Sequence, residues 1–221
     1  DLNRICADLE NYAGDAGMVL SFISDDHFFM EVKKASAPEM VTGFIRLNGT
    51  TVGCVANRTE LYGTDGEKEG EYEAKLTSKG CDKAADFVNF CDAFNIPVLT
   101  LAQTTGFKAD KHTERKIAKA AGRLTYAFAN ATVPKVTVVI GEAYGSAYLT
   151  MNSKSIGADI VYAWPQTSIG MMDAAAAAKI MYADEIAASE DSTALISEKA
   201  AAYRELQSSP LAAAKRGYID D

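Results

Sequence analysis

The feature that most constrains the fold is a repeated order of signals in the middle of the chain. A helical pattern ends at Pro97, an apolar run follows over Val98–Ala102, and a Gly-containing turn leads into the next helical pattern. The same order recurs at Pro134, with an apolar run over Val136–Ile140, so the repeat length is about 37 residues. Short apolar strands that alternate with helices are typical of α/β proteins with buried strands. We therefore expect stacked β-α units that bind ligands where strands turn into helices.

Further elements are expected on either side of this repeat. The residues Asn48-Gly49-Thr50 stand between apolar runs over 41–47 and 51–56, which is a strong β-hairpin signal. Glu60–Lys75 is polar and mostly acidic, so an exposed loop is expected there. Helices are expected over Asp1–Ala13 and from Ser78 or Asp82 onward. A short helix capped by Asp25-Asp26 is expected to carry Phe28, Phe29 and Val32 on one side. A further helix is expected from the helical spacing of Ile117, Ala121, Leu124, Phe128 and Ala131. The remaining expectations are a loop over Gln103–Asp110, a turn over Gly141–Ser146, a strand over Asp159–Ala163 and a helical part over about 172–221.

The helix that starts at Ser78 or Asp82 shows a clear division into two faces. Its apolar face is predicted to carry Ala84, Phe87, Val88, Cys91 and Phe94. Its solvent face is predicted to carry Asp82, Lys83, Asp86 and Asn89. We therefore expect this helix to lie on the buried strands.

The charge of the chain limits the partners that it can have. Its formal net charge is −8, which argues against nucleic acid because phosphate binding needs clustered Lys and Arg. A few local cations would still suffice for the phosphates of CoA. No apolar run approaches the roughly 18 residues that a membrane span needs, so a transmembrane protein is not expected.

The cysteines indicate a reducing compartment. The chain has four, at Cys6, Cys54, Cys81 and Cys91. Their spacing matches no zinc or redox motif, so reduced core thiols in a cytoplasmic protein are expected. The acidic pairs Asp25-Asp26 and Asp220-Asp221 are better explained by helix capping and terminal solvation, and no metal site is expected.

The segment most suited to chemistry is Gly141–Tyr148, which joins a buried strand to a helix and is built largely of small residues. Small residues let a ligand approach the backbone closely. The first N–H groups of a helix lack internal partners and favour an oxyanion. A tight-packing turn without a catalytic role fits the same pattern equally well. The turn Gln103–Phe107 occupies the corresponding position one unit earlier, and its free N–H groups are expected to complete a two-donor site.

Other catalytic devices find little support in the sequence. His27 and His112 each stand near an expected helix start, with no Ser or Cys at motif spacing. The chain contains no P-loop, no G-x-G-x-x-G and no H-E-x-x-H motif. Hydrolysis through a Ser-His-Asp or Cys-His pair is therefore not indicated.

Many short stretches in order resemble one known family. The chain is similar to the C-terminal lobe of carboxyltransferase subunits, such as the β subunits of propionyl-CoA and related acyl-CoA carboxylases and the α subunits of sodium-pumping acyl-CoA decarboxylases. The matching stretches are Val41-Thr42-Gly43-Phe44, Asn48-Gly49, Val52-Gly53, Ala56-Asn57, Lys83–Phe87, Phe90–Pro97, Gly106-Phe107, Ala131–Lys135, Ala143–Tyr148, Gly157-Ala158-Asp159 and Tyr162–Pro165.

The resemblance implies an α/β crotonase (ClpP/crotonase-like) fold of stacked β-β-α units, with residues 1–221 as a single C-terminal lobe. It implies carboxyl transfer between biotin and the α-carbon of an acyl-CoA thioester, with biotin carried on a separate carrier domain or protein. The implied partners are a carboxyltransferase N-terminal lobe that binds most of the CoA, a biotin carboxyl carrier protein and further copies of the chain. Docking to a membrane decarboxylase complex would also fit.

The resemblance also implies roles for individual residues. The N–H groups of Ser146 and Ala147 would hold the ureido oxygen of biotin, and Gly145 would permit the close approach. Thr105, Gly106 and Phe107 would line the opposite wall, Tyr144 and Tyr148 would shape the slot, and Leu149 would favour an apolar acyl tail. The chain departs from the family where Ser146 replaces a second glycine, and where Gln103-Thr104-Thr105 replaces the commoner Asp-x-Pro.

Two other functions remain open at this point. Another crotonase-type enzyme acting on CoA thioesters would need a carboxylate in the pocket, and Glu142 and Glu114 are the nearby candidates. Both are expected to face solvent. A non-catalytic lobe that only mediates subunit assembly is the other alternative. The sequence names neither the acyl group nor the direction of carboxyl transfer.

Overall fold

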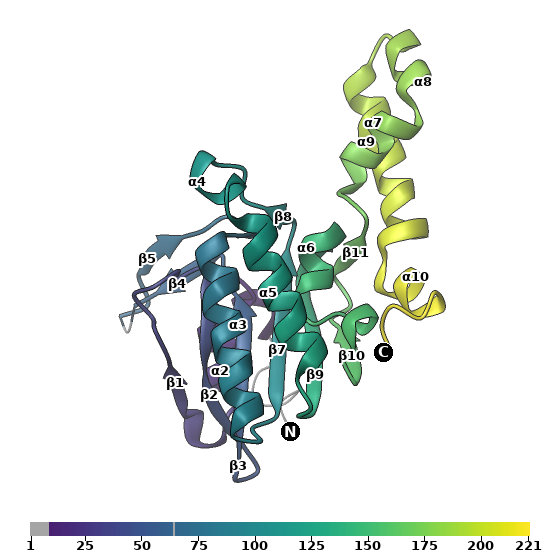
Figure 1. The fold of residues 1–221 in the computed structure, drawn as a ribbon. Helices are drawn as coiled ribbons and strands as arrows, with labels where there is room; N and C mark the ends of the chain where they lie inside the picture. The colour runs from purple at the N-terminus through teal and green to yellow at the C-terminus, as the bar shows by residue number, and fades with distance from the viewer. Residues whose placement is uncertain (1–8, 64) are drawn as a thin grey trace.

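The computed structural model describes residues 9–63 and 65–221, and these residues form a layered α/β body with a helical arm (Figure 1). A seven-stranded sheet has the order β1-β2-β3-β7-β9-β10, and β11 pairs with β9. The first three strands are antiparallel, whereas β3, β7, β9, β10 and β11 pair in parallel. The strands are β1 (Phe29–Glu31), β2 (Met40–Leu47), β3 (Thr50–Asn57), β7 (Val98–Thr104), β9 (Lys135–Tyr144), β10 (Ile160–Ala163) and β11 (Ser168–Gly170).

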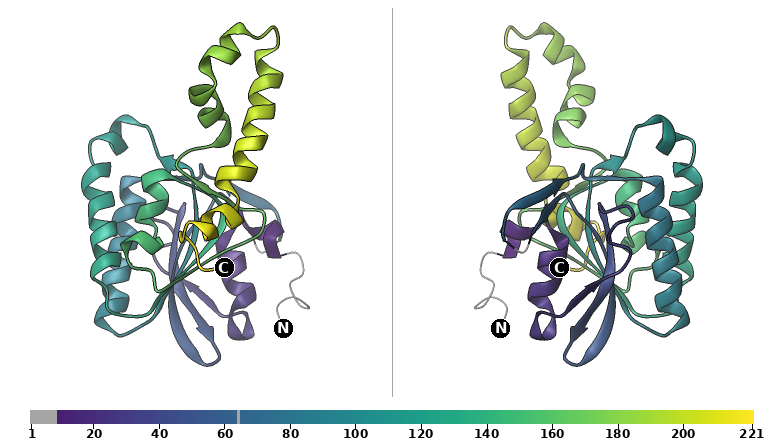
Figure 2. Two further views of the ribbon diagram at one scale, coloured as in Figure 1. Left: turned by 90° about the vertical axis from the view of Figure 1, so that its right-hand side faces the viewer. Right: turned by 90° about the vertical axis from the view of Figure 1, so that its left-hand side faces the viewer.

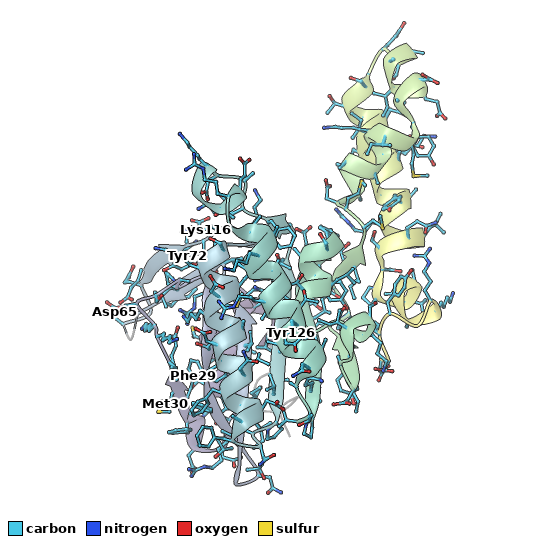
Figure 3. All side chains as sticks on the ribbon, viewed as in Figure 1. Phe29, Met30, Asp65, Tyr72, Lys116 and Tyr126 are labelled. Atoms are coloured by element: carbon cyan, nitrogen blue, oxygen red, sulfur yellow. The ribbon has the colours of Figure 1, made fainter. Side chains whose placement is uncertain are left out.

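Helices cover both faces of this sheet. The long helices α3 (Ser78–Ala93) and α5 (Ile117–Asn130) lie side by side on one face, and α2 (Ala16–Ile23) covers part of the other (Figures 1 and 2). Tyr126, labelled in Figure 3, lies on the exposed outer surface of α5. The predicted order of helix, apolar strand and helix is therefore confirmed. The predicted helix over Asp1–Ala13 lies largely outside the described residues, and Leu9–Tyr12 forms a single 3₁₀ turn.

The hairpin predicted around Asn48-Gly49 is confirmed. Asn48 and Gly49 have φ angles of 48° and 79°, the positive values that a tight two-residue hairpin turn requires. The carboxylate of Asp25 accepts hydrogen bonds from both backbone N–H groups, at 3.1 and 2.7 Å. The predicted helix capped by Asp25-Asp26 is wrong, because Asp26 and His27 also have positive φ angles and Asp25 stabilises the hairpin instead.

Phe29, placed on that predicted helix, lies in β1 and pairs with Ile45. Figure 3 labels it beside Met30 at this edge of the sheet. Short strands are difficult to predict because their stability comes from pairing with a distant strand.

Helix α3 begins as predicted, but two residues of its faces differ from the expectation. Thr77 is the N-cap, and its hydroxyl accepts a hydrogen bond from the Gly80 amide at 2.9 Å. Lys83 is only 4% exposed, since its amino group reaches the Ala37 carbonyl at 3.4 Å. Phe94 is 64% exposed because the helix ends at Ala93.

The acidic segment Glu60–Lys75 contains a hairpin where an exposed loop was predicted. Strands β4 (Glu60–Tyr62) and β5 (Lys68–Glu71) pair in antiparallel fashion. Lys68 crosses the hairpin and contacts the carboxylates of Glu60 and Glu71, at 2.9 and 3.3 Å. The loop was predicted from the many acidic residues of this segment. Lys68 reduces the repulsion between two of these carboxylates, Glu60 and Glu71.

The loop predicted over Gln103–Asp110 also contains regular structure. Strand β7 continues to Thr104, and the short strand β8 (Gly106–Phe107) pairs in parallel with β6 (Lys75–Leu76). A helical turn, α4 (Lys111–Glu114), follows.

A buried charge cluster holds the start of the described chain onto the sheet. The Arg58 side chain, directly after the end of β3, is 2% exposed and contacts two carboxylates. Its Nε lies 3.3 Å from Asp15, and its Nη2 lies 2.9 Å from Glu31. Asp15 in turn accepts hydrogen bonds from the amides of Gly17 and Tyr62, both at 3.0 Å. The cluster therefore joins the start of α2 to β1, β3 and β4.

The C-terminal part forms an arm that projects from the body (Figures 1 and 2). It consists of α7 (Ala174–Met181), α8 (Ala183–Ala188), α9 (Ser192–Tyr203), a π-helical turn over Arg204–Ser208 and α10 (Pro210–Lys215), which returns to the body. Ala174, Ala178 and Ala200 form the small buried contact between α7 and α9. Beyond α10, the amide of Asp220 donates to Val161 and that of Ala163 to Asp221, which fastens the chain beside β10. No helix among the described residues has the length and apolar character to cross a membrane.

The described cysteines are expected to resist alkylation in the folded protein. Cys54, Cys81 and Cys91 are buried free thiols. Burial raises the pKa of Cys81 and of Cys91 to about 12, and it raises the pKa of Cys54 further. Iodoacetamide at pH 8 should therefore label them only after denaturation, as peptide mass spectrometry would measure. Rapid labelling of any of the three in the native protein would contradict this prediction.

Candidate functional site

The predicted turn over Gly141–Ser146 is mostly strand. β9 continues to Tyr144 because β11 pairs alongside it, with Ser168 opposite Glu142 and Gly170 opposite Tyr144. The chain then enters α6 (Gly145–Thr150) without an intervening loop. The prediction of a loop was therefore wrong, whereas the predicted junction between strand and helix is present.

Gly145 is required at this junction by its backbone. Its φ angle is 58°, a value that favours glycine. A Cβ atom at this position would also lie 3.0 Å from the carbonyl oxygen of Met171. Since an α-helix leaves its first N–H groups without internal acceptors, the amides that follow Gly145 are available to a ligand.

A cavity of about 510 Å³ opens beside these amides. Seven of the nine predicted site residues line it: Thr105, Gly106, Phe107, Tyr144, Gly145, Ser146 and Ala147. Four residues that the sequence did not indicate complete it: Met171, Met172, Asp173 and Ala176. The two turns predicted to act together therefore face one cavity.

The other two predicted residues lie elsewhere. Tyr148 and Leu149 line a second cavity of about 760 Å³, which shares Gly145, Ser146 and Met171 with the first. The expectation that Tyr148 and Tyr144 together shape the slot for biotin stays a prediction, with Tyr144 lining the first cavity and Tyr148 the second.

The turn after β7 supplies fewer free donors than expected. The Thr105 amide donates to the Ala74 carbonyl at 2.7 Å, and its hydroxyl donates to the same oxygen at 3.0 Å. The Gln103 amide donates to the Asn57 side chain at 3.0 Å. These two amides are already paired, so the expectation that free N–H groups of this turn complete a two-donor site is wrong for Gln103 and Thr105.

The side-chain chemistry of the first cavity is limited. Tyr144 is buried, and burial raises the pKa of its hydroxyl, which donates to Glu142 at 3.3 Å. Asp173 is the one carboxylate among the described residues that line the cavity. Its two oxygens accept the α7 amides of Ala175 and Ala176, at 2.8 and 3.1 Å, so it caps that helix.

The two carboxylates expected for another crotonase-type enzyme lie away from the first cavity. Glu142 and Glu114 are exposed, and neither lines the first or the second cavity. Among the residues that the structure describes, no group of three or more His, Cys, Asp or Glu could hold a metal ion. The polar side chains among the described lining residues are those of Thr105, Tyr144, Ser146 and Asp173.

The fold and this site define a crotonase-type α/β protein with a cavity at a strand-to-helix junction, and solved structures of the same fold support this class. The chain belongs to the carboxyl transferase domain family, whose model matches residues 1–221.

Relatives with known names agree with this membership. The chain is 40% identical over 208 residues to the methylmalonyl-CoA carboxyltransferase 12S subunit of Propionibacterium freudenreichii subsp. shermanii, covering 94% of this chain and 38% of that protein. It is 39% identical over 221 residues to a putative propionyl-CoA carboxylase beta chain of Bacillus subtilis (strain 168), covering 100% of this chain and 42% of that protein. It is 35% identical over 222 residues to the methylmalonyl-CoA decarboxylase subunit alpha of Propionigenium modestum, covering 100% of this chain and 41% of that protein.

Solved structures agree as well. The transcarboxylase 12S structure superposes with a TM-score of 0.83 at 40% identity, covering 94% of this chain and 38% of that one. The beta subunit of P. aeruginosa geranyl-CoA carboxylase gives a TM-score of 0.74 at 27% identity, covering 90% of this chain and 36% of that one. The chain thus spans less than half the length of these relatives.

Proposed function

We propose that this chain is the biotin-facing half of a carboxyltransferase that moves a carboxyl group between biotin and the α-carbon of an acyl-CoA. The observation that carries the proposal is the convergence of Thr105–Phe107 and Tyr144–Ala147 on one cavity. These two segments are far apart in the chain, and each was expected to contact biotin. The family membership supports the same reaction.

The chemistry of the cavity fits a urea carbonyl. The amides of Ser146 and Ala147 would donate hydrogen bonds to the ureido oxygen, and the missing Cβ of Gly145 leaves room for that approach. When bound, biotin supplies the nitrogen atom that carries the carboxyl group. Donors fixed before the reaction stabilise developing negative charge without reorganisation, which is typically the largest catalytic contribution in such sites.

The neighbouring residues would orient the ligand. Thr105, Gly106 and Phe107 form one wall, which is held by the paired strands β6 and β8. Burial raises the pKa of Tyr144 above its ordinary value, so its hydroxyl stays neutral well beyond physiological pH. Leu149 would contact the acyl group from the second cavity, where an apolar side chain favours an apolar tail.

A complete active site would need partners. We infer an N-terminal lobe that binds most of the CoA, a biotin carboxyl carrier and further copies of the chain, all in the cytoplasm. The transcarboxylase 12S relative is described as a hexamer with methylmalonyl-CoA bound. Docking to a membrane decarboxylase complex is the corresponding arrangement for a decarboxylase.

The chain by itself is expected to show no acyl-CoA carboxylation or decarboxylation. The reason is that the proposed site offers a place for biotin but not for most of the CoA. Addition of a matching N-terminal lobe should restore turnover, measured as transfer of labelled carboxyl from methylmalonyl-CoA to free biotin. Full turnover without that lobe would contradict the proposal.

The alternatives are less well supported. A hydratase or hydrolase of the crotonase class needs a carboxylate base, but Glu142 and Glu114 lie outside both cavities. Asp173 lines the first cavity, but both its oxygens accept hydrogen bonds from the amides that begin α7. A lobe used only for assembly would leave the amides at Ser146 and Ala147 without a ligand. Calorimetric titration with free biotin distinguishes a carboxyltransferase lobe from a lobe used only for assembly, because only the carboxyltransferase lobe should bind biotin.

A further inference from the structure

A cluster of positive charge follows directly after one wall of the first cavity. Thr105, Gly106 and Phe107 line that cavity, and the next part of the chain, residues 108–119, carries five cations and only two carboxylates. This local excess of three positive charges is unusual in a chain of net charge −8. The five cations, called the basic cluster below, are Lys108, Lys111, Arg115, Lys116 and Lys119.

The basic cluster has no ion-pair partner among the residues that the structure describes. Each ion pair between described residues involves a lysine or arginine outside the cluster. Four of the five cluster side chains are exposed, and that of Lys108 is half-buried. These charges are therefore available to a partner of opposite charge.

The basic cluster lies at one side of the first cavity. In Figure 1, α4 and the arm rise on either side of β8 and the start of α6. The cavity is lined by Phe107 of β8, by Ser146 of α6 and, from the foot of the arm, by Met172 and Asp173. A ligand that enters between α4 and the arm therefore passes the basic cluster.

Acidic surfaces border the basic cluster on both sides. Lys108 shares a small cavity with Glu71 and Glu73, so the β4–β5 hairpin is its neighbour. Residues 60–73 carry six carboxylates and one lysine, and residues 173–209 of the arm carry seven carboxylates and three cations. Like charges that face each other are repelled, so this pattern selects a partner whose acidic residues are confined to the part opposite the cluster.

We propose that the basic cluster docks an acidic surface of the protein that carries biotin into the first cavity. The inference rests on the proposed function, under which biotin arrives tethered to a separate carrier. A tethered ligand reaches its cavity only while the carrier lies beside the cavity mouth, and the cluster lies there. Lysine and arginine form charge-assisted hydrogen bonds to carboxylates. Complementary charge also accelerates the encounter of two proteins by about 10–1,000-fold.

The placement of the cations favours a protein partner over a small anion such as the phosphates of CoA. None of the five cluster side chains lines the first or the second cavity. They lie on the outer surface around α4 and the start of α5, where they can contact a bulky partner. A site for a small anion would instead enclose it among several donors.

The test uses two biotinyl-lysine peptides of equal length, one flanked by glutamates and the other by glutamines. Calorimetric titration of the full chain at low ionic strength should show the glutamate-flanked peptide binding about tenfold more tightly. In roughly 1 M salt the screening length falls to about 3 Å, so the preference should disappear. Equal binding of the two peptides at low ionic strength would overturn the proposal.

Two triple variants distinguish the basic cluster from the net charge of the chain. The combined substitutions Lys111→Gln, Arg115→Gln and Lys119→Gln should abolish the preference for the glutamate-flanked peptide. The control combines Lys34→Gln, Lys79→Gln and Lys215→Gln, which remove the same charge from exposed lysines elsewhere, and it should retain the preference. Thermal unfolding of both variants verifies that they are folded. Equal losses in the two variants would refute the role of the cluster.

Two further titrations separate the alternatives. If CoA binds the wild-type chain and the cluster variant weakens CoA as much as it weakens the glutamate-flanked peptide, the cluster is a phosphate site and the proposal is overturned. Free biotin tests the proposed function by itself. If free biotin fails to bind while the glutamate-flanked peptide still binds through the cluster, the proposed function is wrong and the docking surface for an acidic partner stands.

Discussion

Replacing Arg58 with alanine is expected to lower the free energy of unfolding by about 3–5 kcal/mol, because it leaves two buried carboxylates without their cation. Arg58 is 2% exposed, and its partners Asp15 and Glu31 are almost equally buried, at 3% and 10%. The substitution also removes the connection between the start of α2 and the sheet. Urea denaturation followed by circular dichroism measures the effect.

Arg46→Ala is the matched control for this prediction. Arg46 lies on the adjacent strand β2, is exposed, and has its guanidinium 5.5 Å from the centre of the Phe28 ring. An exposed contact of this kind contributes on the order of 0.5–1 kcal/mol. If the two variants lost the same stability, the buried charge cluster would not hold the fold in the way described.

Ala147→Pro is expected to reduce carboxyl transfer at least about a hundredfold in the presence of the N-terminal lobe, because it removes one of the two amides proposed to hold the ureido oxygen. Proline is tolerated in the first turn of a helix, where its missing N–H has no internal acceptor. The fold should therefore persist. The measurement is kcat/KM for free biotin, with thermal unfolding recorded on the same samples.

Ala147→Gly keeps the N–H group and removes only a buried methyl group, so it serves as the control. It should retain activity within several fold of the wild type. Unchanged activity of Ala147→Pro would eliminate this amide as the donor. A loss of activity in both variants, with unfolding at the wild-type temperature, would point to the Ala147 methyl group and its packing.

The parts of the fold that could be predicted are those with local signals. The Asn48-Gly49 turn defines a hairpin by its own backbone preferences, and the repeat from Pro97 to Pro134 indicates β-α units by its periodicity. The parts that were missed depend on distant partners. β1 is stabilised by pairing with β2, and β4 by pairing with β5, where Lys68 contacts Glu60. Neither partner is visible within a short window of sequence.

The candidate site also has a part that local sequence signals predict and a part that depends on distant strand pairing. The junction at Gly145 could be recognised from small residues between an apolar strand and a helix. Met171–Asp173 could not, because these residues reach the cavity only through the pairing of β11 with β9. The position of Tyr148 also required the structure, since the direction in which α6 leaves the sheet decides which cavity its side chain enters.

The sharing of Gly145, Ser146 and Met171 by both cavities has a consequence for attempts to change specificity. A substitution at any of the three alters both compartments at once. Under the proposed function, selection for a new acyl group at these positions would therefore also disturb the fit of biotin. Leu149 and Ile169 belong to only one compartment. They are therefore the positions at which acyl preference can be redesigned while the handling of biotin is preserved.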